Sequence, residues 1–380
     1  MSRKIIMLLN APYPADIRVK KETDALIKAG HTITLLCLRR KNEPYRDSVD
    51  GISIKRIDAG KNNIGLAFWD TIMSISFIHP KFLIALKKAA QEIKPDAVHV
   101  HDLPLVGTAL RARKTFPNLS VVTDFHENYP EALRTWFKWK KNPLVRIKNF
   151  LFMNPKRWTA LERVACKNAD KIIAVVEEMK ERLSNQYQIP LSKITVVTNT
   201  EDKNFIHQAD DPMIYQNFKN KFIMTYCGGI GPHRGVDTAI EAMSRLKAEV
   251  DIMLVIVGFG STSVMDKLKS RVAELNLINV SFLGYQPFNT FYSYMRYADV
   301  NVIPHQANGH TNNTVPHKLF QGMMAGKPLL VSSCAPLKRI VEQYDSGIVF
   351  EAGNPDDFAR QLKILRADSQ LQKTFWRKWN

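Results

Sequence analysis

The chain has 380 residues, of which 45% are hydrophobic and 24% charged, so it can bury two domain cores and is not intrinsically disordered. Its formal net charge of +18 favours an anionic partner: nucleic acid, an anionic membrane surface or a phosphorylated small molecule. The four cysteines form no CxxC pair, which argues against a zinc ribbon and predicts buried, reduced thiols.

Short β-rich apolar runs alternate with helical patterns along the chain, which is typical of parallel sheets joined by crossover helices. In the first half, the predicted strands are KIIMLLN, TITLLCL, ISIKRI, DAVHVH, SVVTDF, KIIAVV and ITVVTN. Residues 18–30 lie between the first two strands, and their apolar side chains recur at helical spacing, with Gly30 as the expected C-terminal cap.

Two hydrophobic segments bear on the location of the protein. The N-terminal apolar run is interpreted as the first core strand, because no small-residue cleavage site follows it. Residues 64–86 are interrupted by Asp70, His79 and Pro80, so we expect a buried or interfacial helix there rather than a membrane span. The sequence therefore predicts a cytoplasmic protein.

A polar stretch interrupts the alternation after residue 200, and the pattern then restarts with FIMTYC, IMLVIV, VSFLG, VNVI, PLLVS and GIVF. We expect an N-terminal domain at residues 1–200, a linker at 201–220, a C-terminal domain at 221–365, and a final helix at 366–380 that crosses back. Ligands of parallel sheets bind beyond the carboxyl ends of the strands, so the residues that follow strands are the site candidates.

The run CGGIGPHRG at residues 227–235 follows a strand and precedes a predicted helix. Glycines allow backbone amides to approach an anion, and Arg234 adds a fixed charge, so the run fits a phosphate site. A tight turn that needs glycine only for its geometry fits equally well. The turn IVGFGS, which contains Gly258, is a weaker signal of the same kind.

The stretch NTVPHKLFQGMMAGKP at residues 313–328 is predicted to begin a helix at Pro316. Lys318 lies in the expected first turn. Beside a glycine-rich loop it is better explained as a diphosphate contact than as a solvated lysine.

Histidines end two strands of the first half. His126 directly follows SVVTDF, and it could act as a general acid or base, donate to a phosphate or sugar hydroxyl, or simply bind loop carbonyls. His101 and Asp102 end the strand DAVHVH in the same way, whereas His99 is expected to be packed.

Residues 134–148 contain six lysines and arginines and no acid, interleaved with Trp136, Phe137 and Trp139. Such a pattern suits an anionic membrane surface, single-stranded nucleic acid or an ordinary solvated helix. We favour membrane contact through residues 133–149, because no nucleic-acid-binding signature accompanies the run.

These motifs, in this order, resemble the retaining GT-B glycosyltransferases of family 4 over most of the chain. The similar segments are DIRVKKETDALIKAGHTI, VHVHDLP, TDFHENYPE, YCGGIGPHRGVDTAIEAM and PHKLFQGMMAGKPLLVS. The resemblance implies the GT-B form of the α/β class, in which two Rossmann-like domains have parallel sheets facing an interdomain cleft.

The resemblance also implies roles for individual residues. His126 would lie near the donor sugar and the acceptor as the catalytic residue, and need not be a nucleophile. The implied donor site comprises Gly228, Gly229, Gly231, Arg234, Lys318, Asn313, Gln321 and Gly258. The implied acceptor side comprises Asp16, Arg18, His101, Asp102 and Glu127.

Three departures from the family pattern affect the implied donor site. The family's two glutamates, spaced E-x7-E, fall on Asn313 and Gln321, which keep an acceptor oxygen and add a donor. The family's arginine after the first loop glycine is replaced by Gly229, which removes one charge. The N-terminal loop NAPYPADIR lacks the paired glycines of the family.

We therefore expect a hexosyltransferase that moves a sugar from a nucleotide-diphosphate sugar, UDP rather than GDP, to a lipid-linked or cell-surface glycan precursor. No DxD motif occurs, so neither a metal nor another cofactor is expected. The expected location is the inner face of the plasma membrane, with no nucleic-acid partner.

Three alternatives stay open. The lost carboxylates favour an inactive GT-B subunit that binds nucleotide sugar or scaffolds a partner. A sugar-nucleotide epimerase shares the architecture and needs no acceptor. A nucleic-acid-binding α/β protein is supported only by the net charge.

Overall fold

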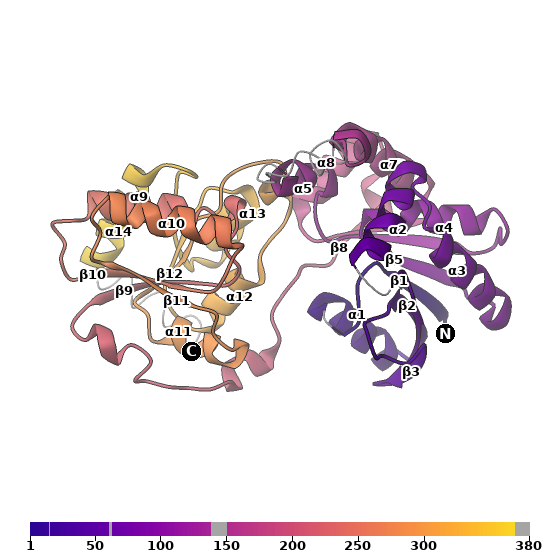
Figure 1. Cartoon of the computed structure of the whole chain (residues 1–380), viewed down its shortest axis with the longest axis horizontal. Coiled ribbons are helices and arrows are strands. Elements are labelled where there is room, and N and C mark those ends of the chain that lie inside the picture. Colours follow the sequence, from indigo (N-terminus) through magenta and orange to yellow (C-terminus); the bar gives the residue numbers. More distant parts are fainter. Residues whose placement is uncertain (15, 61–62, 138–149, 369–380) are drawn as a thin grey trace. The chain divides into compact units, whose positions relative to one another are not determined.

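The chain forms two compact units, Met1–Thr198 and Asn199–Asn380. The computed structural model describes residues 1–14, 16–60, 63–137 and 150–368 (Figure 1). Each unit contains a largely parallel sheet covered by helices, so the predicted α/β class with two parallel-sheet domains is confirmed. All four cysteines are buried and none forms a disulfide, as expected.

The first unit is built on an eight-stranded sheet of order β3-β4-β2-β1-β5-β6-β7-β8. Every pair is parallel except β3 and β4. The sequence did not indicate β3, because its residues RDSV form a polar edge strand with a single apolar side chain. The strands are β1 (Lys4–Leu9), β2 (Thr32–Leu38), β3 (Arg46–Val49), β4 (Ile52–Ile57), β5 (Ala97–His101), β6 (Ser120–Phe125), β7 (Lys171–Ala174) and β8 (Ile194–Val196).

Helix α1 (Ile17–Lys28) of the first unit positions several candidate residues. Asp16 caps its N-terminus by accepting a hydrogen bond from the Arg18 amide, and Gly30 follows its C-terminus with a φ of +83°. Its apolar side chains pack against β1, β2 and β4. The other helices are α2 (Asn63–Ser76), α3 (Pro80–Ile93), η1 (Leu103–Leu105), α4 (Val106–Arg113), α5 (Tyr129–Phe137), α7 (Pro155–Asn168), α8 (Glu177–Tyr187) and η2 (Leu191–Lys193).

The hydrophobic stretch at residues 64–86 is divided between α2 and α3. Phe77 has a φ of +57°, and His79 caps α3 by accepting a hydrogen bond from the Phe82 amide. Among the described residues, no helix has the length and apolar character needed to cross a membrane.

The second unit has a six-stranded parallel sheet of order β11-β10-β9-β12-β13-β14, the arrangement of dinucleotide-binding folds. The strands are β9 (Phe222–Cys227), β10 (Ile252–Val257), β11 (Val280–Gly284), β12 (Val300–Ile303), β13 (Leu329–Ser332) and β14 (Gly347–Phe350). The helices are η3 (Lys203–His207), η4 (Gln216–Phe218), η5 (Pro232–Arg234), α9 (Val236–Arg245), α10 (Thr262–Glu274), η6 (Phe288–Thr290), α11 (Phe291–Arg296), η7 (Thr311–Asn313), α12 (His317–Met324), α13 (Ala335–Tyr344) and α14 (Pro355–Ala367).

Two apolar clusters cover the faces of this sheet. Helices α9, α10 and α14 pack on one face, and α11 and α12 lie on the other (Figure 1). Phe205 and Tyr215 are buried in the second cluster, so the polar segment at 201–220 is anchored to this unit. The expected terminal helix beyond residue 368 and most of the basic aromatic segment, residues 138–149, lie outside the described residues.

Candidate functional site

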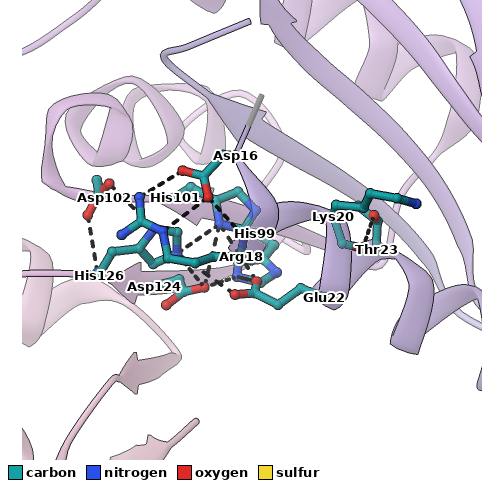
Figure 2. Close-up of polar contacts among 10 residues, drawn as sticks. All are labelled: Asp16, Arg18, Lys20, Glu22, Thr23, His99, His101, Asp102, Asp124 and His126. Carbon is teal, nitrogen blue, oxygen red and sulfur yellow. Dashed lines mark hydrogen bonds and ion pairs between the residues drawn. The ribbon is translucent and has the colours of Figure 1, made fainter. Parts of the chain in front are cut away.

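A buried polar cluster lies at the carboxyl edge of the first sheet (Figure 2). Strands β5 and β6 are parallel neighbours, and His101 is paired with Asp124 in their register. The Asp124 Oδ2 atom lies 3.1 Å from His99 Nε2, 3.5 Å from His101 Nδ1 and 3.3 Å from His126 Nε2. All four side chains are at most 8% exposed, so this carboxylate faces three imidazoles away from water.

Glu22 of α1 completes the cluster. Its Oε2 atom lies 3.7 Å from both His99 Nε2 and His101 Nδ1, and its Oε1 atom lies 3.8 Å from His126 Nε2. Burial and the charge of Asp124 raise the pKa of Glu22 to about 9. At neutral pH, with no other cation present, this carboxyl therefore holds a proton.

The pKa values of the other groups in the cluster are shifted in opposite directions. Burial and the neighbouring His99 lower the pKa of His101 to about 3. Burial alone would also lower the pKa of His126, but Asp102 and Asp124 raise it to about 9. Burial opposes ionisation of Asp124, yet the facing histidines hold its pKa well below the usual value.

Three charged side chains form the more open rim of this cluster. Arg18 makes a two-point ion pair with Asp16, with Nη2–Oδ2 and Nε–Oδ1 distances of 2.7 and 3.0 Å. Asp102 accepts a hydrogen bond of 3.1 Å from the His126 amide and lies 3.6 Å from its ring Nδ1. The Asp16, Arg18 and Asp102 side chains are 18%, 30% and 27% exposed, so a ligand in solvent can reach them.

The structure thus brings together five residues of the predicted set: Asp16, Arg18, His101, Asp102 and His126. Glu127 is half-buried and follows His126 in the chain. Sequence reasoning missed Glu22 and Asp124. Asp124 lies two residues before His126, and Glu22 lies four residues after Arg18. Strand and helix periodicity could therefore have pointed to both.

Two glycine turns meet at the carboxyl edge of the second sheet. Cys227 pairs with Val257 in the register of β9 and β10, so Gly228 and Gly258 follow side by side. Their φ angles are +124° and +145°, and a Cβ atom on Gly258 would lie only 1.9 Å from the Gly228 carbonyl oxygen. Both positions therefore require glycine. Gly229 is different, since a Cβ atom there would meet nothing within 4 Å.

Lys318 reaches this turn from the first turn of α12. Its Nζ atom lies 3.6 Å from the centre of the Tyr226 ring and would be 3.1 Å from a Cβ atom on Gly228. The ammonium is buried and has no hydrogen-bond partner among the described residues. Burial and the nearby Arg234 lower the pKa of Lys318 well below its usual value.

Arg234 and three histidines surround the same turn. Arg234 Nη1 lies 3.3 Å from His305 Nε2, and the His233 ring lies 5.3 Å from the His310 ring. Burial and Arg234 lower the pKa of His233 to about 3 and that of His310 to about 4. Sequence reasoning did not single out these histidines, although HQANGH follows β12 after Pro304 and His233 lies within CGGIGPHRG. With Gly231 leading into η5, this region is suited to an anionic ligand.

The two amides that replace the expected glutamates have different surroundings. Asn313 donates from Nδ2 to the Gly309 carbonyl at 2.8 Å. Gln321 donates from Nε2 to Glu201 Oε2 at 2.6 Å, and the Glu201 side chain is only 5% exposed. Glu201, which the sequence did not indicate, therefore places a carboxylate beside residue 321, where the family pattern has a glutamate.

Comparisons with known proteins agree with this architecture. A model of the family described as Glycosyltransferase Family 4 matches residues 17–203, and one described as Glycosyl transferases group 1 matches residues 208–378. An uncharacterized glycosyltransferase of Methanocaldococcus jannaschii is 26% identical over 56% of this chain and 54% of its own length. An Escherichia coli protein named "Putative colanic acid biosynthesis glycosyl transferase WcaI" is 25% identical over 46% of this chain and 43% of its own length. This chain thus spans about half the length of those relatives or less.

Solved structures show the same fold at low identity. Sucrose-phosphate synthase from Thermosynechococcus elongatus aligns with a TM-score of 0.78 and 17% identity over 99% of this chain and 93% of that one. Anabaena HepE in complex with UDP aligns with a TM-score of 0.70 and 14% identity over the same shares. The fold is therefore GT-B, with two Rossmann-like units. Since the two family models together match most of the chain, it belongs to the family 4-like glycosyltransferases.

Proposed function

We propose that this protein transfers a hexosyl group, with retention of configuration, from a UDP-sugar to a hydroxyl group of a glycan precursor. Its family supports glycosyl transfer. The Anabaena neighbour was solved with UDP, which supports a UDP-sugar as the donor. The name of the E. coli relative assigns it to colanic acid biosynthesis, which supports a polysaccharide precursor as the acceptor.

The observation that carries this proposal is the buried ammonium of Lys318. Removing an ammonium from water costs on the order of several kcal/mol unless a partner offsets it. Lys318 makes no hydrogen bond to a described residue, and it adjoins two glycine turns and Arg234. A diphosphate would bring negative charge to Lys318 and Arg234 and accept hydrogen bonds from the loop amides.

The proposed transfer is a front-face substitution. The bond between the sugar anomeric carbon and the diphosphate oxygen breaks, and the acceptor oxygen bonds to the same face of that carbon. The acceptor's proton passes to an oxygen of the leaving diphosphate. Arg234 and Lys318 offset the developing charge, so the donor diphosphate needs neither a metal ion nor another cofactor.

On the acceptor side, we assign direct contact to the rim residues Asp16, Arg18 and Asp102, because they are the more open groups of the first cluster. The His126 side chain is only 1% exposed and faces Asp102 and Asp124. Its proposed part is therefore to hold Asp102, and not to act as a nucleophile.

We also propose that the acceptor is presented at a membrane surface. The six basic residues within 134–148 and the aromatic residues among them are the basis of this step. Sedimentation with vesicles tests it. Binding to anionic but not zwitterionic vesicles is expected, with a loss of binding when Lys138, Lys140 and Lys141 are changed to glutamine.

Calorimetric titration with UDP, GDP, ADP and their common sugars tests the donor site. We expect selective binding of a uridine nucleotide that Arg234→Ala weakens at least about tenfold, since a charge-assisted contact contributes about 1.5–3 kcal/mol. Lys338→Ala, on the exposed face of α13, is the matched control. No binding of any nucleotide would overturn the proposal. Isomerisation of the donor without acceptor would favour an epimerase.

A further inference from the structure

The buried cluster of the first unit has the donor set of a transition-metal site. Glu22, His101, Asp124 and His126 each offer one ligand atom, and these atoms all lie within 4.8 Å of one another. They come from α1, β5, β6 and the residue that follows β6. Two imidazoles and two carboxylates are ligands that Zn²⁺ accepts in tetrahedral sites.

The spacing of these atoms fits metal ligands better than hydrogen-bonded pairs. Metal–ligand bonds of 2.0–2.2 Å in a tetrahedron place neighbouring ligand atoms about 3.3–3.6 Å apart. His101 Nδ1 lies 3.4 Å from His126 Nε2, and Asp124 Oδ2 lies 3.5 and 3.3 Å from those two atoms. These separations exceed the usual 2.7–3.2 Å of a hydrogen bond. The closest Glu22 oxygens lie slightly farther away, at 3.7 and 3.8 Å.

The charge of the cluster and a buried oxygen atom of Glu22 also favour a metal ion. The Glu22 Oε2 atom is buried and accepts no hydrogen bond from a described residue. The acidic groups of Glu22 and Asp124 both face the His101 and His126 rings, so the cluster offers two acidic ligands to a single cation. A divalent ion with two neutral imidazoles and two carboxylates makes the site electrically neutral.

The neighbours of these ligands also resemble the outer shell of a metal site. His126 Nδ1 lies 3.6 Å from Asp102 Oδ2, on the side of the ring opposite the cluster. Asp124 Oδ2 lies 3.1 Å from His99 Nε2. The first contact would orient a metal-bound imidazole and the second a metal-bound carboxylate, as outer-shell groups do.

We propose that Glu22, His101, Asp124 and His126 bind one Zn²⁺ ion, which ties α1 to the carboxyl ends of β5 and β6. The sequence predicted no metal ion, so this proposal differs from that expectation. The proposal uses only residues of the first unit, and it does not rest on the proposed transfer reaction. In the metal-bound protein, the His126 ring positions Asp102 at the open rim.

Metal titration of the full chain tests the proposal. The protein is stripped with EDTA, dialysed and titrated with Zn²⁺ by calorimetry, and Co²⁺ is added separately as a spectroscopic probe. We expect one Zn²⁺ per chain, a higher Tm in the zinc-loaded protein, and the intense visible bands of tetrahedral Co²⁺. Asp124→Asn and Glu22→Gln should each weaken Zn²⁺ binding by about 100-fold or more.

Two variants make the zinc titration specific to this cluster. Glu22→Gln affects a half-buried helix residue and keeps its shape, so it reports on the metal if Asp124→Asn fails to fold. His31→Gln alters a histidine at the amino end of β2 and should bind Zn²⁺ like the unaltered protein. Zinc binding that Glu22→Gln leaves unchanged, or that His31→Gln removes, would overturn the proposal. So would equal Tm values with and without Zn²⁺.

Discussion

The side-chain nitrogen of Gln321 donates a hydrogen bond of 2.6 Å to the carboxylate of Glu201, although 120 residues separate the two in sequence. His317 Nδ1 also lies 3.8 Å from this carboxylate. The negative charge expected at residue 321 is thus present on a neighbouring residue. This relationship weakens the case for an inactive subunit, which the sequence had based on the lost carboxylates.

Restoring the family residue with Gln321→Glu should therefore damage the site. Two largely buried carboxylates would face each other, one would take up a proton, and the 2.6 Å hydrogen bond would lose its donor. We expect a loss of about 1–3 kcal/mol in the free energy of unfolding, together with weaker nucleotide binding. Thermal unfolding and calorimetry measure the two effects.

The double variant Glu201→Gln with Gln321→Glu is the control for this effect. It exchanges the donor and the acceptor and keeps one carboxylate, so most of the lost stability should return. If Gln321→Glu alone were as stable as the unaltered protein and bound nucleotide more tightly, Glu201 would not be the compensating group.

Replacing Lys318 with methionine should separate stability from binding. Methionine keeps much of the side-chain volume over Tyr226 but removes a buried ammonium that makes no hydrogen bond to a described residue. We expect the nucleotide-free protein to gain about 1 kcal/mol or more in unfolding free energy, because no buried charge needs a partner. Nucleotide binding should fall at least about tenfold, as expected for a lost charge-assisted contact.

Lys327→Met is the matched control for Lys318→Met. Lys327 is half-buried, and burial lowers its pKa, but it follows the C-terminal end of α12. Nucleotide affinity should stay unchanged in this variant. Equal losses of affinity in the two variants would show that Lys318 acts through the general charge of the unit and not through a direct contact.

Sequence patterns were sufficient for most of the fold because its strands are short apolar runs between helices. The strand β3 was not predicted, because RDSV is not an apolar run. The glycine turns and Lys318 could be found because their residue types are unusual after a strand or at the start of a helix. Glu201 could not be found, because its contact with Gln321 depends on how residues 201–220 pack on the second sheet. Glu22 shares a helix face with Arg18, but its contacts with the histidines of β5 and β6 depend on how α1 packs on the sheet.

His233 of the second unit should make stability depend on pH. The pKa of His233 is lowered from its usual value of 6.5 to about 3 by burial and Arg234. As the pH falls, His233 therefore becomes protonated near pH 6.5 in the unfolded chain but only near pH 3 in the folded chain. Stability is full above pH 6.5 and falls as the pH decreases through this window.

The variant His233→Gln tests this dependence. Below about pH 6.5, its unfolding free energy should fall less steeply with decreasing pH, by up to about 1.4 kcal/mol per pH unit. Calorimetric unfolding between about pH 5 and pH 8 measures the slope, with His31→Gln as the control in the first unit. Identical slopes in His233→Gln and the unaltered protein would mean that His233 has the same pKa in the folded and unfolded chain.

The open position of Gly229 allows a gain of affinity to be predicted. The family pattern has an arginine here, and a Cβ atom at Gly229 would meet nothing within 4 Å. Its φ also lies outside the left-handed region, unlike those of Gly228 and Gly258, so a side chain introduces no backbone strain. Gly229→Arg should fold normally and bind UDP several-fold more tightly, because it adds a cation beside the proposed diphosphate site. The gain should shrink as salt is raised.

Gly229→Gln, similar in size but uncharged, is the control for Gly229→Arg. An equal gain in that variant would assign the effect to packing and not to charge, whereas weaker binding in both would place the ligand directly against the Gly229 backbone.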